Sequence, residues 1–155
     1  GILFATIIFS KKHNINKYIF LDLISASAPI GIFLGRISNF INSELYGRET
    51  DVFWSVIFTK IDDVSRHPSQ IYEAILEGLV LFIVMFLYAK KNYLSKPGLL
   101  SALFLIFYSI FRFIAEFYRA PDEQLGFILL NLTMGQIISL IFFSFGFYLF
   151  FKKKN

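Results

Sequence analysis

Long apolar runs are the feature of this sequence that most constrains its fold. After a short apolar stub at residues 1–9, four stretches come close to the roughly 20 residues that a helix needs to cross a bilayer: 17–41, 71–89, 98–118 and 127–151. The composition agrees, because 56% of the 155 residues are hydrophobic and only 17% are charged. A soluble domain of this size could not bury so much apolar surface, so the surplus is expected to face lipid.

These runs predict an all-α fold, a polytopic integral membrane helical domain with four full transmembrane helices plus the end of a fifth at the N-terminus. The stub at 1–9 would rise only about 13 Å as a helix, against a hydrocarbon core of about 30 Å. It begins at Gly1 and ends before Lys11 and Lys12. We therefore expect one transmembrane domain over 1–155 that is truncated at its N-terminus, with an extracytoplasmic loop at about 42–70.

The cysteine and histidine content and the distribution of charge exclude several classes of protein. The chain has no cysteine, which excludes disulfides, thiolate nucleophiles and cysteine-ligated metals. Its two histidines, His13 and His67, are too few and too far apart for a metal cluster, so we expect neither metal nor cofactor. The net charge of +4 comes from short basic clusters between apolar runs, and we expect no nucleic-acid partner.

The lysines predict the orientation of the chain in the membrane. They gather at residues 11–17, 90–96 and 152–154, which fall on one side if the spans alternate, whereas Lys60 falls on the other. The positive-inside rule makes the side with the three clusters cytoplasmic. We therefore expect a cytoplasmic C-terminus and an extracytoplasmic loop around Lys60.

The arginines do not follow this bias. Arg36 and Arg112 lie inside apolar spans, and the other three arginines lie at the outer boundary. An arginine in hydrocarbon costs at least ~2.5–3.5 kcal/mol on insertion scales, which makes both residues functional candidates. A guanidinium group can grip phosphate or carboxylate with two donors at once. The structural alternative, in which Arg36 pairs with Glu44 and Arg112 with Glu116 to hold helices together, stays open.

The third span carries a polar stripe. Tyr108, Arg112, Glu116 and Arg119 recur at i, i+4, i+8 and i+11, which predicts one helical face that lines a protein interior or a wet cavity. A role in helix packing alone stays open for this stripe. Asn39 follows Arg36 by about one turn on a similar face, and either a ligand contact or an interhelical hydrogen bond would explain it.

A third polar cluster precedes the second span. Gln70, Glu73 and Glu77 share a face that enters the membrane from the outer side. Carboxylates in a span need partners, and the surplus arginines could supply them. His67 could shuttle a proton there, or serve only as a hydrogen-bond donor.

Four ordered blocks of the sequence closely resemble those of a known family, the bacterial prolipoprotein diacylglyceryl transferases. They are GRISNFINSELYGR at 35–48, RHPSQIYE at 66–73, RFIAEFYRAPDEQLG at 112–126 and TMGQ at 133–136. The resemblance covers essentially the whole chain and implies a seven-helix bacterial inner-membrane protein whose first helices and His-Gly-Gly motif lie upstream of Gly1. Ser43 stands where the family usually has glycine.

The resemblance implies an enzyme that moves the diacylglyceryl group of phosphatidylglycerol onto the lipobox cysteine thiol of a prolipoprotein, forms a thioether and releases glycerol phosphate. Arg36 and Arg112 match the family's essential arginines and would hold the phosphate leaving group. Asn39, Glu44 and Gly47 match other functional positions of the signature.

The same resemblance gives Glu116 and Arg119 the role of aligning the arginines or contacting the glycerol and the peptide. It places the proposed general base on the upstream histidine, with His67 a weaker local candidate. The active site would face the outer side of the membrane. Two alternatives stay open, a non-catalytic phospholipid-binding transporter and a structural membrane subunit.

Overall fold

The structure is a computed structural model that describes residues 1–155 except 93–95, 122–125, 130–131 and 155. Its helices are α1 Ile2–His13, α2 Lys17–Asn42, α3 Ser69–Glu73, the π-helix η1 Ala74–Val80, α4 Leu81–Asn92, α5 Leu99–Ala115 and α6 Met134–Lys154. Two short antiparallel hairpins complete the described part: β1 Val56–Ile57 with β2 Ser65–Arg66, and β3 Phe127–Leu129 with β4 Leu132–Thr133.

Three helical segments are long and apolar enough to cross a membrane: Lys17–Asn42, Ser69–Lys91 and Met134–Lys153. A shorter apolar helix, Leu99–Ala115, accompanies them. The predicted helical membrane domain is therefore confirmed, although the third predicted span is 17 residues long as a helix rather than a full-length one.

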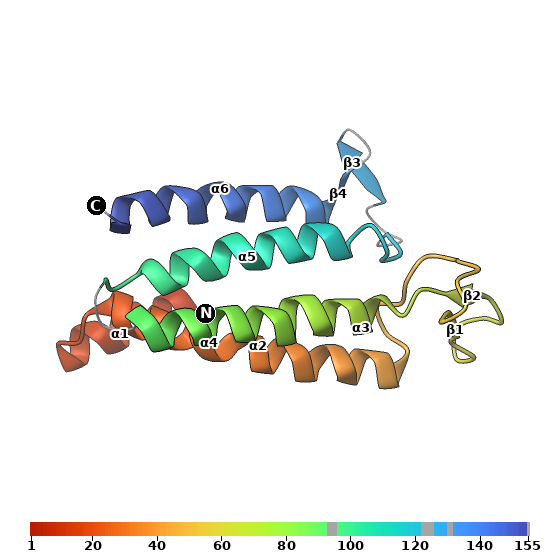
Figure 1. Ribbon diagram of the computed structural model, residues 1–155, viewed down its shortest axis with the longest axis horizontal. Helices are drawn as coiled ribbons and strands as arrows, with labels where there is room; N and C mark the ends of the chain where they lie inside the picture. The colour runs from red at the N-terminus through yellow and green to blue at the C-terminus, as the bar shows by residue number, and fades with distance from the viewer. Residues whose placement is uncertain (93–95, 122–125, 130–131, 155) are drawn as a thin grey trace.

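The long helices lie side by side (Figure 1), with α6 along α5 and α5 in contact with both α2 and α4. The continuous helix α3–η1–α4 packs against α2, most extensively through η1. Gly78 of η1 permits this, because a Cβ at that position would lie 2.6 Å from the Cβ of Phe33. Both hairpins lie at one end of the helices, and the C-terminus lies at the other.

A buried carboxylate joins α2 to α5 near the end of the helices that carries the C-terminus. Both carboxylate oxygens of Asp22 accept hydrogen bonds, one from the Gly98 amide (2.6 Å) and the other from the amide and hydroxyl of Ser101 (2.8 and 2.6 Å). Gly98 and Ser101 stand at the start of α5, where amide groups lack partners within the helix. Asp22 therefore caps α5 from a neighbouring helix.

Two sequence predictions were wrong at helix ends. The last span was expected to begin at residue 127, but described residues of 127–133 form the β3–β4 hairpin, and α6 begins at Met134. Reciprocal hydrogen bonds at the start of α6 favour this, since the Thr133 amide donates to Gln136 Oε1 (3.1 Å) and the Gln136 amide to Thr133 Oγ1 (3.3 Å).

The third span ends earlier than its polar stripe predicts. Helix α5 ends at Ala115, so Tyr108 and Arg112 lie on the helix, Glu116 is its C-terminal cap and Arg119 lies beyond it. Arg119 instead forms an antiparallel bridge with Gly47. The reason is non-local: the backbone of residues 46–48 pairs with that of 118–120 and takes over its hydrogen bonds.

Candidate active site

Five buried or partly buried charged residues meet inside the membrane-spanning helices. Arg36 comes from α2, Glu73 from α3, Glu77 from η1, Arg112 from α5, and Glu116 from the end of α5. Ion pairs join these side chains to one another, and we call the five residues the charge cluster. It gathers three separate blocks of the sequence in one place.

Glu73 is shared by the two arginines. Its Oε2 lies 2.9 Å from Nη1 of Arg36, and its Oε1 accepts a hydrogen bond of 2.6 Å from Nη1 of Arg112. The carboxylate is 0% exposed, and the two arginine side chains are 16% and 12% exposed. Because one rigid carboxylate binds both guanidinium groups, it fixes the distance between them.

Glu77 is held less closely. Its Oε2 accepts a hydrogen bond of 3.3 Å from Nη2 of Arg36, and its Oε1 lies 3.6 Å from Nη1 of Arg112. The sequence predicted that the surplus arginines would partner these carboxylates, and the structure contains those pairs. Among the described residues, Arg36 pairs with Glu73 and Glu77, so the alternative pairing with Glu44 is wrong.

Glu116 ties the charge cluster to α6. Its Oε2 lies 2.6 Å from Nη2 of Arg112, which is the pair that the structural alternative predicted. Its Oε1 accepts a hydrogen bond of 2.9 Å from the hydroxyl of Thr133. Gly135 leaves room for the carboxylate, since a Cβ there would lie 2.7 Å from Glu116 Oε1. The conformation of Glu116 is therefore set by the start of α6.

A pocket of about 260 Å³ adjoins the charge cluster. It is lined by Arg36 and Asn39 from one face of α2, as the spacing predicted, together with Tyr108 from α5, Ile32 and Gly35. A guanidinium group, an amide and a phenol offer hydrogen bonds to one small anion. The pocket therefore has the chemistry to bind a phosphate group.

Three of the predicted site residues meet outside the membrane-spanning helices, namely Gly47, His67 and Arg119, which we call the outer group. Gly47 bridges Arg119 on one side and packs on His67 on the other, where a Cβ would overlap the His67 carbonyl oxygen and lie 2.7 Å from the His67 Cβ. Glycine is thus required there by close packing.

Glu44 belongs to neither group. Its side chain is exposed, and its contribution to the fold is its backbone carbonyl, which accepts a hydrogen bond of 2.6 Å from Nε2 of Gln70. This bond ties the end of α2 to the start of α3. The role that the signature implies for the Glu44 side chain therefore stays a prediction.

His67 lies in a different pocket, of about 360 Å³, whose other lining residues are Trp54, Tyr72, Ile75, Leu76, Ile114 and Tyr118. Its Nδ1 is 3.1 Å from the hydroxyl of Tyr72, and its ring packs edge-on against Tyr72 and Tyr118. Burial lowers the pKa of His67, which favours the neutral ring. A neutral imidazole can accept a proton, so its geometry leaves a base role open.

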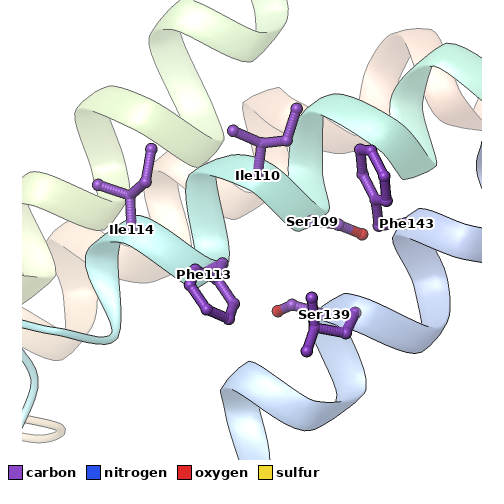
Figure 2. A pocket seen from close by; sticks show the side chains of 7 residues that line it. Ser109, Ile110, Phe113, Ile114, Ser139 and Phe143 are labelled. Carbon is purple, nitrogen blue, oxygen red and sulfur yellow. The ribbon is translucent and has the colours of Figure 1, made fainter.

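A third pocket, of about 220 Å³, lies between α5 and α6 (Figure 2). Ile110, Phe113, Ile114, Leu140 and Phe143 line it, and Ser109 and Ser139 supply the polar atoms. The hydroxyl of Ser139 is already bound to the Gly135 carbonyl (2.7 Å). This pocket suits a hydrocarbon chain rather than a phosphate group.

Sequence reasoning did not include Glu73, Glu77 or Tyr108 among the site residues. Their signal was present, because Glu73 and Glu77 lie four residues apart in an apolar span and Tyr108 lies one turn before Arg112. The part of the 112–126 block at residues 122–125 lies outside the described residues. Within the described chain, no group of three or more His, Asp and Glu residues could hold a metal ion.

Comparisons with known proteins agree with the family resemblance of the four sequence blocks. A family model described as prolipoprotein diacylglyceryl transferase matches residues 1–152. A phosphatidylglycerol–prolipoprotein diacylglyceryl transferase of Rickettsia bellii (strain OSU 85-389) is 51% identical over 98% of this chain and 58% of its own length.

Proteins of the same name from two other bacteria are also similar. The protein of Campylobacter curvus (strain 525.92) is 46% identical over 100% of this chain and 56% of its own length. The protein of Campylobacter jejuni (serotype O:6, strain 81116) is 49% identical over 92% of this chain and 51% of its own length. The chain thus spans between half and three fifths of the relatives that it matches.

Proposed function

The chain belongs to the prolipoprotein diacylglyceryl transferase family, and on that premise we propose that it carries the phosphate-binding part of such an enzyme. The proposed reaction transfers the diacylglyceryl group of phosphatidylglycerol to the lipobox cysteine thiol of a prolipoprotein. The observation that carries the proposal is the pair of arginines, Arg36 and Arg112, that Glu73 holds together beside the pocket of Asn39 and Tyr108.

The chemistry explains why two fixed arginines would serve this reaction. The cysteine sulfur attacks a glycerol carbon, a carbon–sulfur bond forms, and the carbon–oxygen bond to the phosphate breaks. The electron pair of that bond stays on the phosphate oxygen, and glycerol phosphate leaves. Guanidinium groups already ordered in a site of low dielectric constant stabilise that growing negative charge without having to reorganise.

The other predicted residues take roles around this step. Asn39 and Tyr108 would hydrogen-bond the head group in the pocket that they line with Arg36. Glu116 would orient Arg112, because it binds Nη2 of Arg112 and is itself fixed by Thr133. Glu44 and the outer group would contact the glycerol or the incoming peptide from the outer boundary.

The thiol must lose its proton to a base. The family resemblance assigns this role to a histidine of a His-Gly-Gly motif that this chain does not contain. His67 remains the local candidate, since burial lowers its pKa and the ring is neutral near pH 7. Its pocket also holds apolar side chains that could accept an apolar peptide segment.

We place the protein in the bacterial inner membrane, with the C-terminus in the cytoplasm and the active site toward the outer side. The three lysine clusters support this orientation. Single cysteines introduced at Asn155 and Lys60 test it with a membrane-impermeant thiol reagent on intact spheroplasts. We expect Lys60→Cys to react and Asn155→Cys to react only after lysis, and the opposite pattern would refute the orientation.

The test of the proposed function is thioether formation on a lipobox peptide with phosphatidylglycerol as donor, followed by mass spectrometry with the purified full-length protein. Only a transferase predicts a product heavier by one diacylglyceryl group together with free glycerol phosphate. A lipid transporter or a structural subunit predicts neither. Absence of both products with folded protein would refute the proposal.

A further inference from the structure

The charge cluster contains one more carboxylate than guanidinium groups. In it, Arg36 and Arg112 form ion pairs with Glu73, Glu77 and Glu116. If all five were ionised, the cluster would carry a net negative charge between apolar helices. Such a charge is costly in a membrane interior and would repel an anionic phosphate group.

The three carboxylates differ in how firmly they are paired. Glu73 and Glu116 each have an arginine nitrogen within 2.6 Å, and Glu116 also accepts the Thr133 hydroxyl. The closest arginine nitrogens to Glu77 are farther away, at 3.3 and 3.6 Å. Glu77 therefore gains the least from being ionised.

We propose that Glu77 is protonated when the phospholipid phosphate binds, whereas Glu73 is the ionised bridge that sets the spacing of the two arginines. The proposal rests on the proposed function, in which Arg36 and Arg112 bind that phosphate. Both glutamates are positioning residues, because each acts through the arginines. The proton on Glu77 brings the cluster to zero net charge and leaves the phosphate the only uncompensated anion.

The surroundings of Glu77 support this assignment. The charged and titratable groups that face it are Arg36 from α2, Glu73 from the preceding turn, and Arg112 and Tyr108 from α5. Its side chain is 0% exposed, so water does not screen the repulsion from Glu73. As the pH rises and Glu77 loses its proton, the cluster regains a negative charge and its affinity for phosphate falls.

Two isosteric substitutions separate the two roles. Glu77→Gln copies the protonated side chain, whereas Glu73→Gln removes the shared anion that holds both guanidinium groups. With phosphatidylglycerol vesicles and a lipobox peptide, we expect Glu77→Gln to be at least about ten times as active as Glu73→Gln, because removing Glu73 takes the closest carboxylate away from both buried guanidinium groups. Asp51→Asn, at an exposed loop carboxylate, controls for the loss of one negative charge.

The pH profile is the readout that a merely structural glutamate would not change. Relative to Glu77→Gln, wild-type activity should fall as the pH is raised, because only the wild type can lose the proton. If the ratio of the two activities is flat, or if Glu77→Gln is as inactive as Glu73→Gln while folded, the proposal is overturned. Should Glu77→Gln not fold, Glu77→Met supplies a second neutral side chain for the same comparison.

Infrared spectroscopy tests the proton without relying on turnover. The difference spectrum between wild type and Glu77→Gln, recorded with phosphatidylglycerol present, should contain the carbonyl band of a protonated carboxylic acid, and the corresponding spectrum for Glu73→Gln should not. Absence of the band would overturn the proposal. If the band is present but wild type forms no thioether, the proposed function fails while the assignment of the proton stands.

Discussion

Two buried carboxylates, Asp22 and Glu73, lie toward opposite ends of the helices and have different partners. Asp22 is 2% exposed and receives three hydrogen bonds from neutral donors at the start of α5. Glu73 is 0% exposed and receives its contacts from two arginines beside a pocket of about 260 Å³. The first carboxylate joins helices. The second holds cations next to a space that an anion can enter.

This comparison separates stability from activity. Changing Asp22 should weaken the fold and leave the turnover of each folded molecule nearly unchanged. Changing the arginines of the charge cluster should remove activity even when the helices still pack. Substitutions at each site therefore test whether stability and activity can be separated in this way.

The largest effect is expected from Arg36→Lys. Lysine keeps the positive charge but loses the planar pair of donors, so it cannot bind Glu73, Glu77 and phosphate together. We expect thioether formation to fall by a factor of about 10²–10³, comparable to the loss of one donor that stabilises an oxyanion. The measurement is the initial rate with purified protein of verified fold.

Arg66→Lys is the matched control for that change. Arg66 pairs with Asp62 at 2.5 Å in the extramembrane loop, and this hydrogen bond lowers the pKa of Asp62. Because Arg66 lies outside the charge cluster, we expect its substitution to cost far less activity. Equal losses from both substitutions would show that the arginines matter to the fold and not to the phosphate.

A smaller effect is expected from Asp22→Asn, and it should appear in stability. The amide replaces one acceptor oxygen by a donor and faces the amide groups of Gly98 and Ser101, which leaves a buried donor without a partner. The expected loss is about 1–3 kcal/mol of unfolding free energy. Thermal unfolding in detergent measures it, and a large drop in turnover per folded molecule would show that Asp22 also serves activity.

The smallest effect is expected on the pH dependence of stability, from His67. Its partners are neutral, like the hydrogen-bond donors around Asp22. Burial lowers its pKa in the folded protein below the unfolded value of about 6.5, so the stability that it contributes is present above about pH 6.5 and is lost as the pH falls toward the folded pKa. We expect the melting temperature to fall on acidification more in wild type than in His67→Gln. Identical pH dependence in both proteins would contradict this.

The sequence predicts the apolar helices well because the length of an apolar run is a local property. It fails where the chain pairs with a distant segment. Arg119 was expected on the helical stripe with Arg112. The backbone of residues 46–48 instead forms hydrogen bonds with that of residues 118–120, and α5 ends at Ala115. The start of α6 was misplaced because the Thr133–Gln136 cap, not hydropathy, sets it.

The candidate site was predictable in part for the same reason. Arg36 and Arg112 stand out because a charge in an apolar run is unusual, and Asn39 follows from helical spacing. Glu73 lies 37 positions after Arg36 and 39 positions before Arg112 in the sequence. No local pattern therefore reveals that one carboxylate binds both arginines. The exposed side chain of Glu44 shows that an apparent partner nearby in sequence can point elsewhere.

The most direct test of the central claim is the double substitution Arg112→Gln with Glu116→Gln. If Arg112 serves only to balance the carboxylates of the charge cluster, removing Glu116 as well should restore activity and stability relative to Arg112→Gln alone, because one carboxylate is lost with the one guanidinium group. If Arg112 binds the phosphate, the double variant should fold better yet remain as inactive as the single one, by a factor of about 10²–10³. Diacylglyceryl transfer to a lipobox peptide by the purified full-length variants decides between them, and recovery of activity in the double variant would contradict this account.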